Sequence, residues 1–177
     1  MFKDYRIHLL ALGVFFLVTS LFNAPVFSGK TIEQNDIKQY RGSAREIHQY
    51  RDNDDRQILW TNVMFAGMPS YVISTVYGGE LLKFVPKAFT KTLNPAVGFP
   101  LLLMIGFYIL ALSLKVDPLI GIAGALAYGF STYFMIVLEA GHNSKIHAMA
   151  YLPGILAGMI WAYRQKRVLM GTVIFAL

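Results

Sequence analysis

The sequence predicts an all-α fold, a polytopic bundle of transmembrane helices. Its 177 residues are 55% hydrophobic and only 15% charged, whereas an ordinary soluble domain has about 25% charged residues. Sixteen of the 26 charged residues lie between residues 24 and 92, so the rest of the chain holds long uncharged runs. This pattern excludes a disordered chain, a collagen and a nucleic-acid-binding domain. The lack of cysteine excludes a disulfide framework and a cysteine-based zinc or redox site.

The uncharged runs predict four complete spans, at residues 7–27, 93–114, 118–138 and 147–163. Each run is close to the roughly 20 residues that a helix needs to cross the hydrocarbon core. Residues 168–177 are equally apolar but too few for a span. We expect a truncated fifth span; the alternative is a segment that is buried against the other helices. The chain then reads as the N-terminal part, 1–177, of one membrane domain in a longer protein.

Basic residues in the short connections predict the orientation. Lys3 and Arg6 precede the first run, Lys115 follows the second, and residues 164–167 after the fourth run contain three more cations. Since such residues stay on the cytoplasmic side, we expect a multi-pass protein of the cytoplasmic membrane with a cytoplasmic N-terminus and an uncleaved first span. Residues 28–92 and 139–146 then form external loops. The net charge of +6 is mainly a topology signal, and no nucleic-acid partner is expected.

The long external loop is predicted to carry amphipathic helices. Residues 31–51 place apolar side chains at helical spacing, with Thr31 and Gln34 as a capping box and residues 52–55 as a terminating turn. In the aromatic-rich stretch that follows, Trp60, Phe65 and Met68 are expected to form an interfacial helix at headgroup level.

Two groups in this loop are candidates for chemistry. Asp36, with Glu33 beside it, follows the first span and could act as a general base or hold a divalent cation (Mg²⁺ or Mn²⁺) against a phosphate. Alternatively, these acids only complement a helix macrodipole. Arg41 and Arg45 recur at helical spacing and could bind phosphate, or they are surface residues neutralised by nearby acids such as Glu46.

The second external loop holds another candidate group, His142, Asn143 and Lys145. Ionisable groups near membrane depth are functional candidates, so these residues could contact a phosphate or another part of a substrate. The alternative is a loop that is merely polar. His142 and His147 do not have the spacing of a helical zinc site. Glycines in the third and fourth spans are interpreted as helix-packing residues.

Three segments carry a resemblance to a known family. They are Gln34-Asn35-Asp36-Ile37-Lys38-Gln39-Tyr40-Arg41-Gly42, Leu59-Trp60-Thr61-Asn62-Val63-Met64-Phe65-Ala66-Gly67-Met68-Pro69-Ser70-Tyr71, and Ala140-Gly141-His142-Asn143-Ser144-Lys145 followed by Ala150-Tyr151-Leu152-Pro153. In order and spacing the chain resembles the start of YfhO-family multi-pass membrane proteins, most specifically in the LW-N-x-x-x-x-GMP element.

The resemblance implies a GT-C-like bundle and a glycosyltransferase that uses a polyprenyl-phosphate-linked sugar on the outer face of the membrane. Asp36 best matches the acidic catalytic residue expected in the first external loop, and Glu33 and Glu46 are weaker matches that could substitute for it. By the same implication, Arg41, Arg45, His142, Asn143 and Lys145 would bind the lipid phosphate, and Trp60 would guide the isoprenoid chain. A divalent cation is compatible with this site but is not required by any pattern.

Two other functions stay open. A transporter or flippase-like protein would use the same basic loop to bind a lipid-linked or anionic solute without catalysis, and Asp36 would then be a surface residue. A purely structural subunit would tolerate alanine at both Asp36 and His142. The sequence does not fix the oligomeric state, the sugar or the acceptor.

Overall fold

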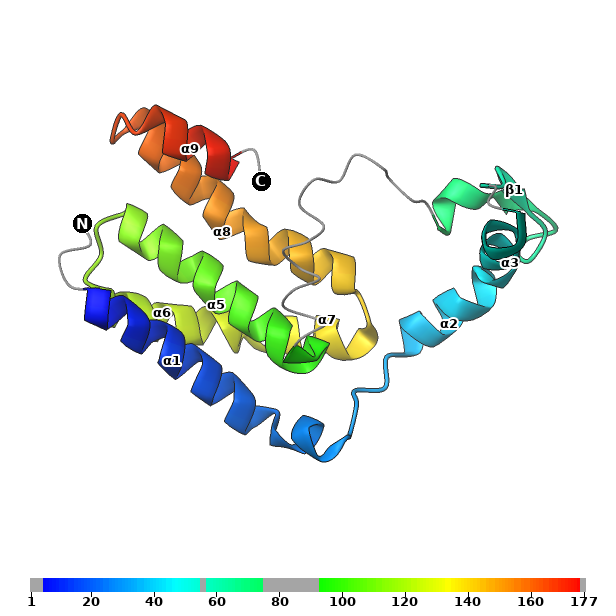
Figure 1. Cartoon of the computed structure of the whole chain (residues 1–177), viewed down its shortest axis with the longest axis horizontal. Coiled ribbons are helices and arrows are strands. Elements are labelled where there is room, and N and C mark those ends of the chain that lie inside the picture. The colour runs from blue at the N-terminus through cyan, green and yellow to red at the C-terminus, as the bar shows by residue number, and fades with distance from the viewer. Residues whose placement is uncertain (1–4, 55–56, 75–92, 176–177) are drawn as a thin grey trace. The chain divides into compact units, whose positions relative to one another are not determined.

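The computed structural model describes residues 5–54, 57–74 and 93–175, which are mostly helical (Figure 1). The chain divides into two compact units. The large unit comprises Met1–Ile32 and Leu82–Leu177, and the small unit comprises Glu33–Leu81. We describe each unit by itself.

The large unit contains the apolar helices. Its elements are α1 (Tyr5–Phe22), the 3₁₀ turn η1 (Ala24–Ser28), α5 (Pro95–Ser113), α6 (Pro118–Gly129), α7 (Thr132–Ala140), α8 (Asn143–Tyr163) and α9 (Val168–Phe175). The small unit contains α2 (Asn35–Ser43), α3 (Arg45–Asp54), a two-stranded antiparallel hairpin of β1 (Trp60–Thr61) and β2 (Met68–Pro69), and the 3₁₀ turn η2 (Ser70–Val72).

Helix α5 is the centre of the large unit. It packs against α1, α6 and α8 (Figure 1), and 78% of its apolar window is buried. The helix starts where predicted because the Asn94 side chain accepts a hydrogen bond from the Ala96 N–H (3.0 Å) and Pro95 occupies its first turn. Since all its faces meet other helices, α5 is apolar all round.

Helix α1 buries only one narrow stripe. Ala11, Phe15 and Thr19, spaced four apart, are fully buried, while only 17% of the whole apolar window is buried. The Phe15 ring meets the edge of Tyr108, with centroids 5.7 Å apart. The many exposed leucines of α1 suit a lipid surface. The α-helix ends at Phe22, earlier than the predicted residue 27, because Pro25 in the following 3₁₀ turn has no N–H to continue it.

The predicted third span, 118–138, is two helices. α6 starts as expected, with Asp117 accepting from the Leu119 N–H (2.9 Å), but the chain bends by 41° between α6 and α7. Gly129 at the bend lies against Met104 and the Pro100 carbonyl of α5, where no side chain would fit. The described residues therefore contain three helices long and apolar enough to cross a membrane, α1, α5 and α8, or four spans if α6 and α7 count as one.

Other predicted boundaries also shift. The second external loop, 139–146, is only two residues long, because α7 ends at Ala140, Gly141 takes the left-handed conformation (φ 99°) and α8 begins at Asn143. α9 occupies the predicted partial span from Val168 to Phe175. Residues 75–92 of the long loop lie outside the described residues.

Small residues let the helices approach closely, as predicted for the third span. Added Cβ atoms at Gly121 and Gly124 would meet aromatic rings of α5 at 3.3 Å and 2.9 Å. The prediction is wrong for Gly154 of the fourth span, which has open space around it. α5 and α8 approach each other closely at Gly106, which lies against the carbonyl oxygen of Ala150.

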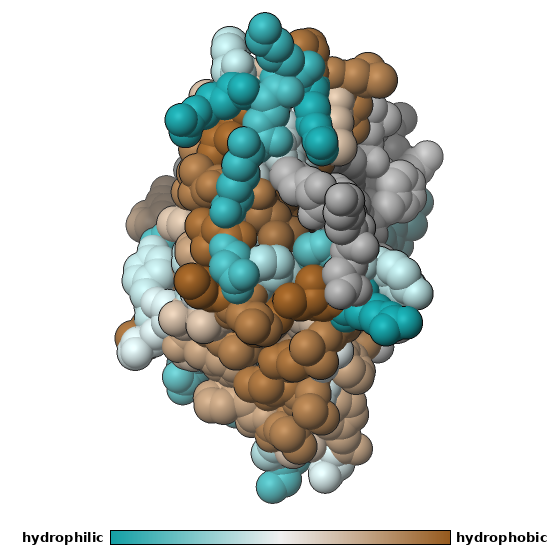
Figure 2. Space-filling view, turned by 90° about the vertical axis from the view of Figure 1, so that its left-hand side faces the viewer, coloured by the Kyte–Doolittle hydropathy of each residue, from teal (hydrophilic) through white to brown (hydrophobic). Residues whose placement is uncertain are grey.

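The charged residues of the large unit are unevenly divided between its two ends. The end formed by the α5–α6 and α8–α9 turns carries Lys115, Arg164, Lys166 and Arg167, and Arg6 lies near the start of α1. Figure 2 looks onto this end and shows hydrophilic side chains gathered above a hydrophobic surface. The α7–α8 turn at the other end carries Glu139, His142 and Lys145.

Candidate functional site

Asp36 lies in the first turn of α2 and is half-buried. The helix begins at Asn35, with Gln34 as its N-cap and no capping hydrogen bond from the side chain of that residue. The predicted start at Thr31 and its capping box are therefore wrong. Glu33, just before the helix, forms an exposed ion pair with Lys38. Asp36 thus lies where an acidic side chain complements the positive end of a helix dipole.

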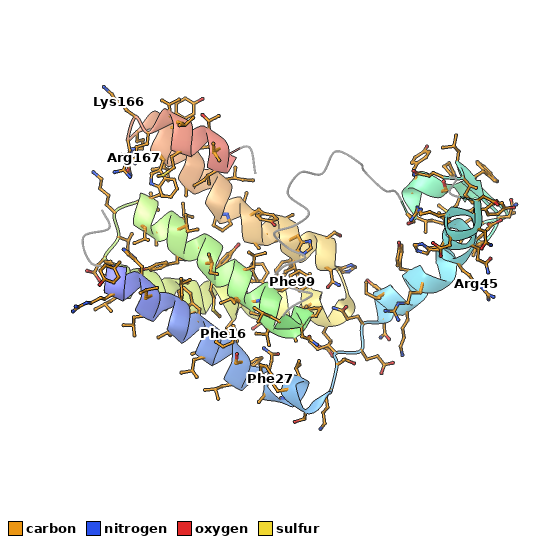
Figure 3. The ribbon with its side chains drawn as sticks, viewed as in Figure 1. Phe16, Phe27, Arg45, Phe99, Lys166 and Arg167 are labelled. Carbon is orange, nitrogen blue, oxygen red and sulfur yellow. The ribbon has the colours of Figure 1, made fainter. Side chains whose placement is uncertain are left out.

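Arg41 and Arg45 are exposed and are not gathered around Asp36. At about 100° per residue, Arg41 lies about 140° around α2 from Asp36. Arg45 follows the interruption at Ala44 and starts α3, and Figure 3 shows its side chain on the small unit. The single helix predicted for 31–51 is thus two shorter helices, and Arg41 lies on a different face of α2 from the candidate base.

Trp60 lies on the hairpin rather than on an interfacial helix, so the helix predicted for Trp60, Phe65 and Met68 is wrong. Trp60 starts β1 and pairs with Pro69 of β2. Its ring packs over Gly67, where an added Cβ would lie 2.7 Å from the indole nitrogen. Phe65 sits at the tip with φ 52° and is 83% exposed. The aromatic groups are thus presented by a tight turn.

Glu46 anchors the hairpin to α3, a role that sequence reasoning missed. Its carboxylate accepts hydrogen bonds from the Thr61 hydroxyl and from the Asn62 backbone N–H (2.9 Å). These two donors hold the pKa of the Glu46 carboxyl below its usual value. Thr61 is fully buried, so the contact satisfies its hydroxyl inside the unit. Glu46 is thereby committed to structure and is a poor substitute for Asp36 as a base.

A second unpredicted cluster joins Tyr40, His48 and Ser74. The Tyr40 hydroxyl lies 3.0 Å from the buried Ser74 hydroxyl and 3.4 Å from Nε2 of His48. Tyr40 is one turn after Asp36 and therefore shares its face of α2. Tyr40 and Ser74 are 34 residues apart in the sequence, so no local spacing reveals their contact. The helical spacing of Tyr40 indicates only an apolar contact.

The second candidate group lies at the α7–α8 turn. His142 is exposed and caps α8, and Asn143 and Lys145 occupy the first turn of that helix. The ammonium of Lys145 lies 5.2 Å from the centroid of the Tyr133 ring, a cation–π distance. These residues form a small polar cap on the large unit. Asp36, Arg41, Arg45 and Trp60 belong to the small unit, so the predicted site residues are divided between the two units.

Within the described ranges, no three His, Asp or Glu side chains converge as metal ligands. The divalent cation stays a prediction.

Comparison with known proteins adds no relative. No protein-family model, curated protein or solved structure matches this chain.

Proposed function

We propose that this chain is part of a membrane glycosyltransferase of the GT-C type, similar to YfhO-family proteins, with four spans in which α6 and α7 together count as one. The observation that carries the proposal is the position of Asp36. It lies in the first turn of the first helix after α1 and its 3₁₀ turn, where it is half-buried. A carboxylate there could meet a lipid-linked donor and an acceptor hydroxyl outside the membrane.

In the proposed reaction Asp36 is the base. Asp36 takes the proton of the acceptor hydroxyl as its oxygen attacks the anomeric carbon, and the bond from that carbon to the polyprenyl phosphate breaks. The resemblance also assigns phosphate binding to His142, Asn143 and Lys145, which form the polar cap of the large unit. The exposed hairpin side chains of Trp60 and Phe65 contact the isoprenoid chain. A divalent cation, where present, would neutralise the same phosphate.

A sugar-transfer assay in membranes that contain the protein tests this proposal. Asp36→Asn keeps the size and removes the base, and we expect transfer to fall at least a hundredfold. Asp52→Asn, an exposed acid at the end of α3, is the matched control and should leave transfer unchanged. Unchanged transfer by Asp36→Asn would remove Asp36 from the mechanism.

The second candidate function is transport of a lipid-linked or anionic solute. The 41° break between α6 and α7 favours it, because interrupted membrane helices form binding sites in many transporters. Translocation of a labelled polyprenyl-linked sugar into vesicles, without any bond cleavage, would support this function over glycosyl transfer.

The proposed location is the cytoplasmic membrane with a cytoplasmic N-terminus, supported by the basic end of the large unit. Because the chain has no cysteine, single cysteines can report sidedness. Gln49→Cys should react with a membrane-impermeant maleimide in intact cells, and Arg167→Cys should react only after permeabilisation. The reverse pattern would invert the topology and refute the outer-face reaction.

A further inference from the structure

A polar pocket opens at the basic end of the large unit, and none of its lining residues takes part in the proposed reaction. It has a volume of about 230 Å³ and lies between the C-terminal ends of α5 and α8. The Gln165 side-chain amide donates to the Ser113 carbonyl (2.7 Å) and so joins the two walls. The lining residues are Ser113, Leu114, Lys115, Ile160, Arg164 and Gln165.

The charge of the pocket favours an anion. Lys115 and Arg164 both line it, and within the part of the chain that the structure describes neither forms an ion pair with a carboxylate. Two helix C-termini contribute only about half a negative charge each, so the two full cations outweigh them. The carboxylate of Asp117, which accepts from the Leu119 N–H at the start of α6, keeps its negative charge but does not line the pocket. Lys166 and Arg167, labelled in Figure 3 at the same end, add to the positive field.

The backbone at Lys115 adds a separate observation. Lys115 has φ 62°, in the left-handed region, and ends α5 with the bonds Lys115 N–H to Leu112 O and Val116 N–H to Ala111 O. This is the Schellman arrangement, in which glycine usually occupies the left-handed position. Lysine at this position places a cation at the pocket, although its left-handed backbone conformation is less favourable than that of glycine. Lys166 also has a left-handed backbone (φ 54°) but does not line the pocket.

We propose that this pocket binds the phosphate group of an anionic lipid headgroup in the leaflet that the basic end of the large unit meets. Arg164 provides the forked donors that match phosphate oxygens, and Lys115 provides a second charge. Basic pockets between membrane helices are a known form of headgroup site. The inference does not depend on the proposed glycosyl transfer, because none of its residues takes part in that reaction.

Lipid titration of the purified protein in neutral detergent tests the proposal, with native mass spectrometry as the readout. We expect phosphatidylglycerol to bind at least tenfold more tightly than phosphatidylcholine. Arg164→Gln should weaken phosphatidylglycerol binding about tenfold, the loss expected for one charge-assisted hydrogen bond. Arg164→Lys, which keeps the charge, should weaken it less. If inorganic phosphate competes with phosphatidylglycerol, the free anion also fits the pocket. If inorganic phosphate does not compete, the pocket requires the lipid.

A matched pair of variants separates the pocket from diffuse charge. Lys115→Gly and Lys166→Gly each remove one cation. Each also places glycine at a left-handed backbone position, where glycine has no steric cost, so both variants should fold with an unchanged or higher melting temperature. Only Lys115→Gly should weaken lipid binding about tenfold. Equal weakening by both variants, or no weakening by either, would overturn the proposal.

Discussion

Different interactions stabilise the interior of each of the two units of this protein. In the large unit, long helices satisfy their own backbone hydrogen bonds and meet through apolar side chains and glycines, as α5 meets α8 at Gly106. In the small unit, the strands are two residues long, and side chains such as Glu46 and Ser70 supply much of the bonding that a longer ladder would provide. The Ser70 hydroxyl, for example, donates to the Ile58 carbonyl.

This difference predicts where each unit is vulnerable. The large unit should be most sensitive to added volume at a helix contact, because close packing leaves no room. The small unit should be sensitive to backbone geometry in its turn and to the loss of single hydrogen bonds, because few apolar contacts compensate them. The following variants test this contrast from the largest expected effect to the smallest.

Gly106→Ala should give the largest loss. The new methyl group would fall on the Ala150 carbonyl oxygen of α8, so the two helices must separate, at a cost of about 3 kcal/mol in unfolding free energy. Unfolding in mixed detergent micelles measures it. Gly154→Ala on α8, where nothing lies within 4 Å, is the control and should leave stability unchanged or raise it by up to about 1 kcal/mol, because alanine favours a helix more strongly than glycine does. Equal effects at the two glycines would mean that α5 and α8 do not pack as described.

Gly67→Ala should produce the next largest loss, in the small unit. Gly67 has φ 120°, and a methyl group there would meet the Trp60 ring at 2.7 Å. We expect the free energy of unfolding of the small unit to fall by about 2 kcal/mol. The measurement is the rate of proteolysis between residues 57 and 74, which should increase. Gly42→Ala, in the open part of α2, should have the opposite sign and slow proteolysis slightly. A stable Gly67→Ala hairpin would refute the Trp60 packing.

Much of the large unit could be predicted, because hydrocarbon thickness fixes the length of an uncharged run. α5 and α8 lie close to their predicted boundaries for this reason. The break between α6 and α7 could not be predicted in this way, because residues 118–138 are apolar throughout and hydropathy does not register a bend. The sequence Gly129-Phe130-Ser131 was its only local signal.

The small unit was predicted less well for a related physical reason. Two-residue strands have no periodicity, so the aromatic residues between 57 and 77 suggested a helix. Gly67 and Pro69 were the turn signals that could have indicated the hairpin. Asp36 does lie in the first turn of a helix, as the position of the acids suggested. The contacts of Glu46 with Thr61 and of Tyr40 with Ser74 join distant residues, and no local spacing encodes them.

Tyr40→Phe should have a smaller effect that tests the polar side of the contrast. It removes the hydroxyl that contacts the buried Ser74 hydroxyl at 3.0 Å, at an expected cost of about 1 kcal/mol. Protease protection of residues 57–74 provides the measurement. Tyr50→Phe, exposed on α3, removes a hydroxyl of the same kind and should have no effect. A loss that is equal in the two variants would show that the Tyr40 contact contributes nothing of its own.

Glu46→Gln should have the smallest effect at neutral pH and the most distinctive pH dependence. The folded pKa of Glu46 is below its usual value of 4.5, so its charged form stabilises the small unit above that value, and the contribution is lost as the pH falls through the folded pKa. Glutamine can still accept the Thr61 hydroxyl, so the variant loses only the charge. Trp60 fluorescence in a Trp161→Phe background reports the transition.

The wild-type hairpin should therefore lose stability as the pH falls below 4.5. In Glu46→Gln this acid transition should be absent. Asp52→Asn at the exposed end of α3 is the control and should leave the transition in place. A step that persists in Glu46→Gln would assign the acid sensitivity to another carboxyl. In that case the hydrogen bonds of Glu46 would not stabilise the small unit. The contrast between a small unit stabilised by single hydrogen bonds and a large unit stabilised by helix packing would then fail for this residue.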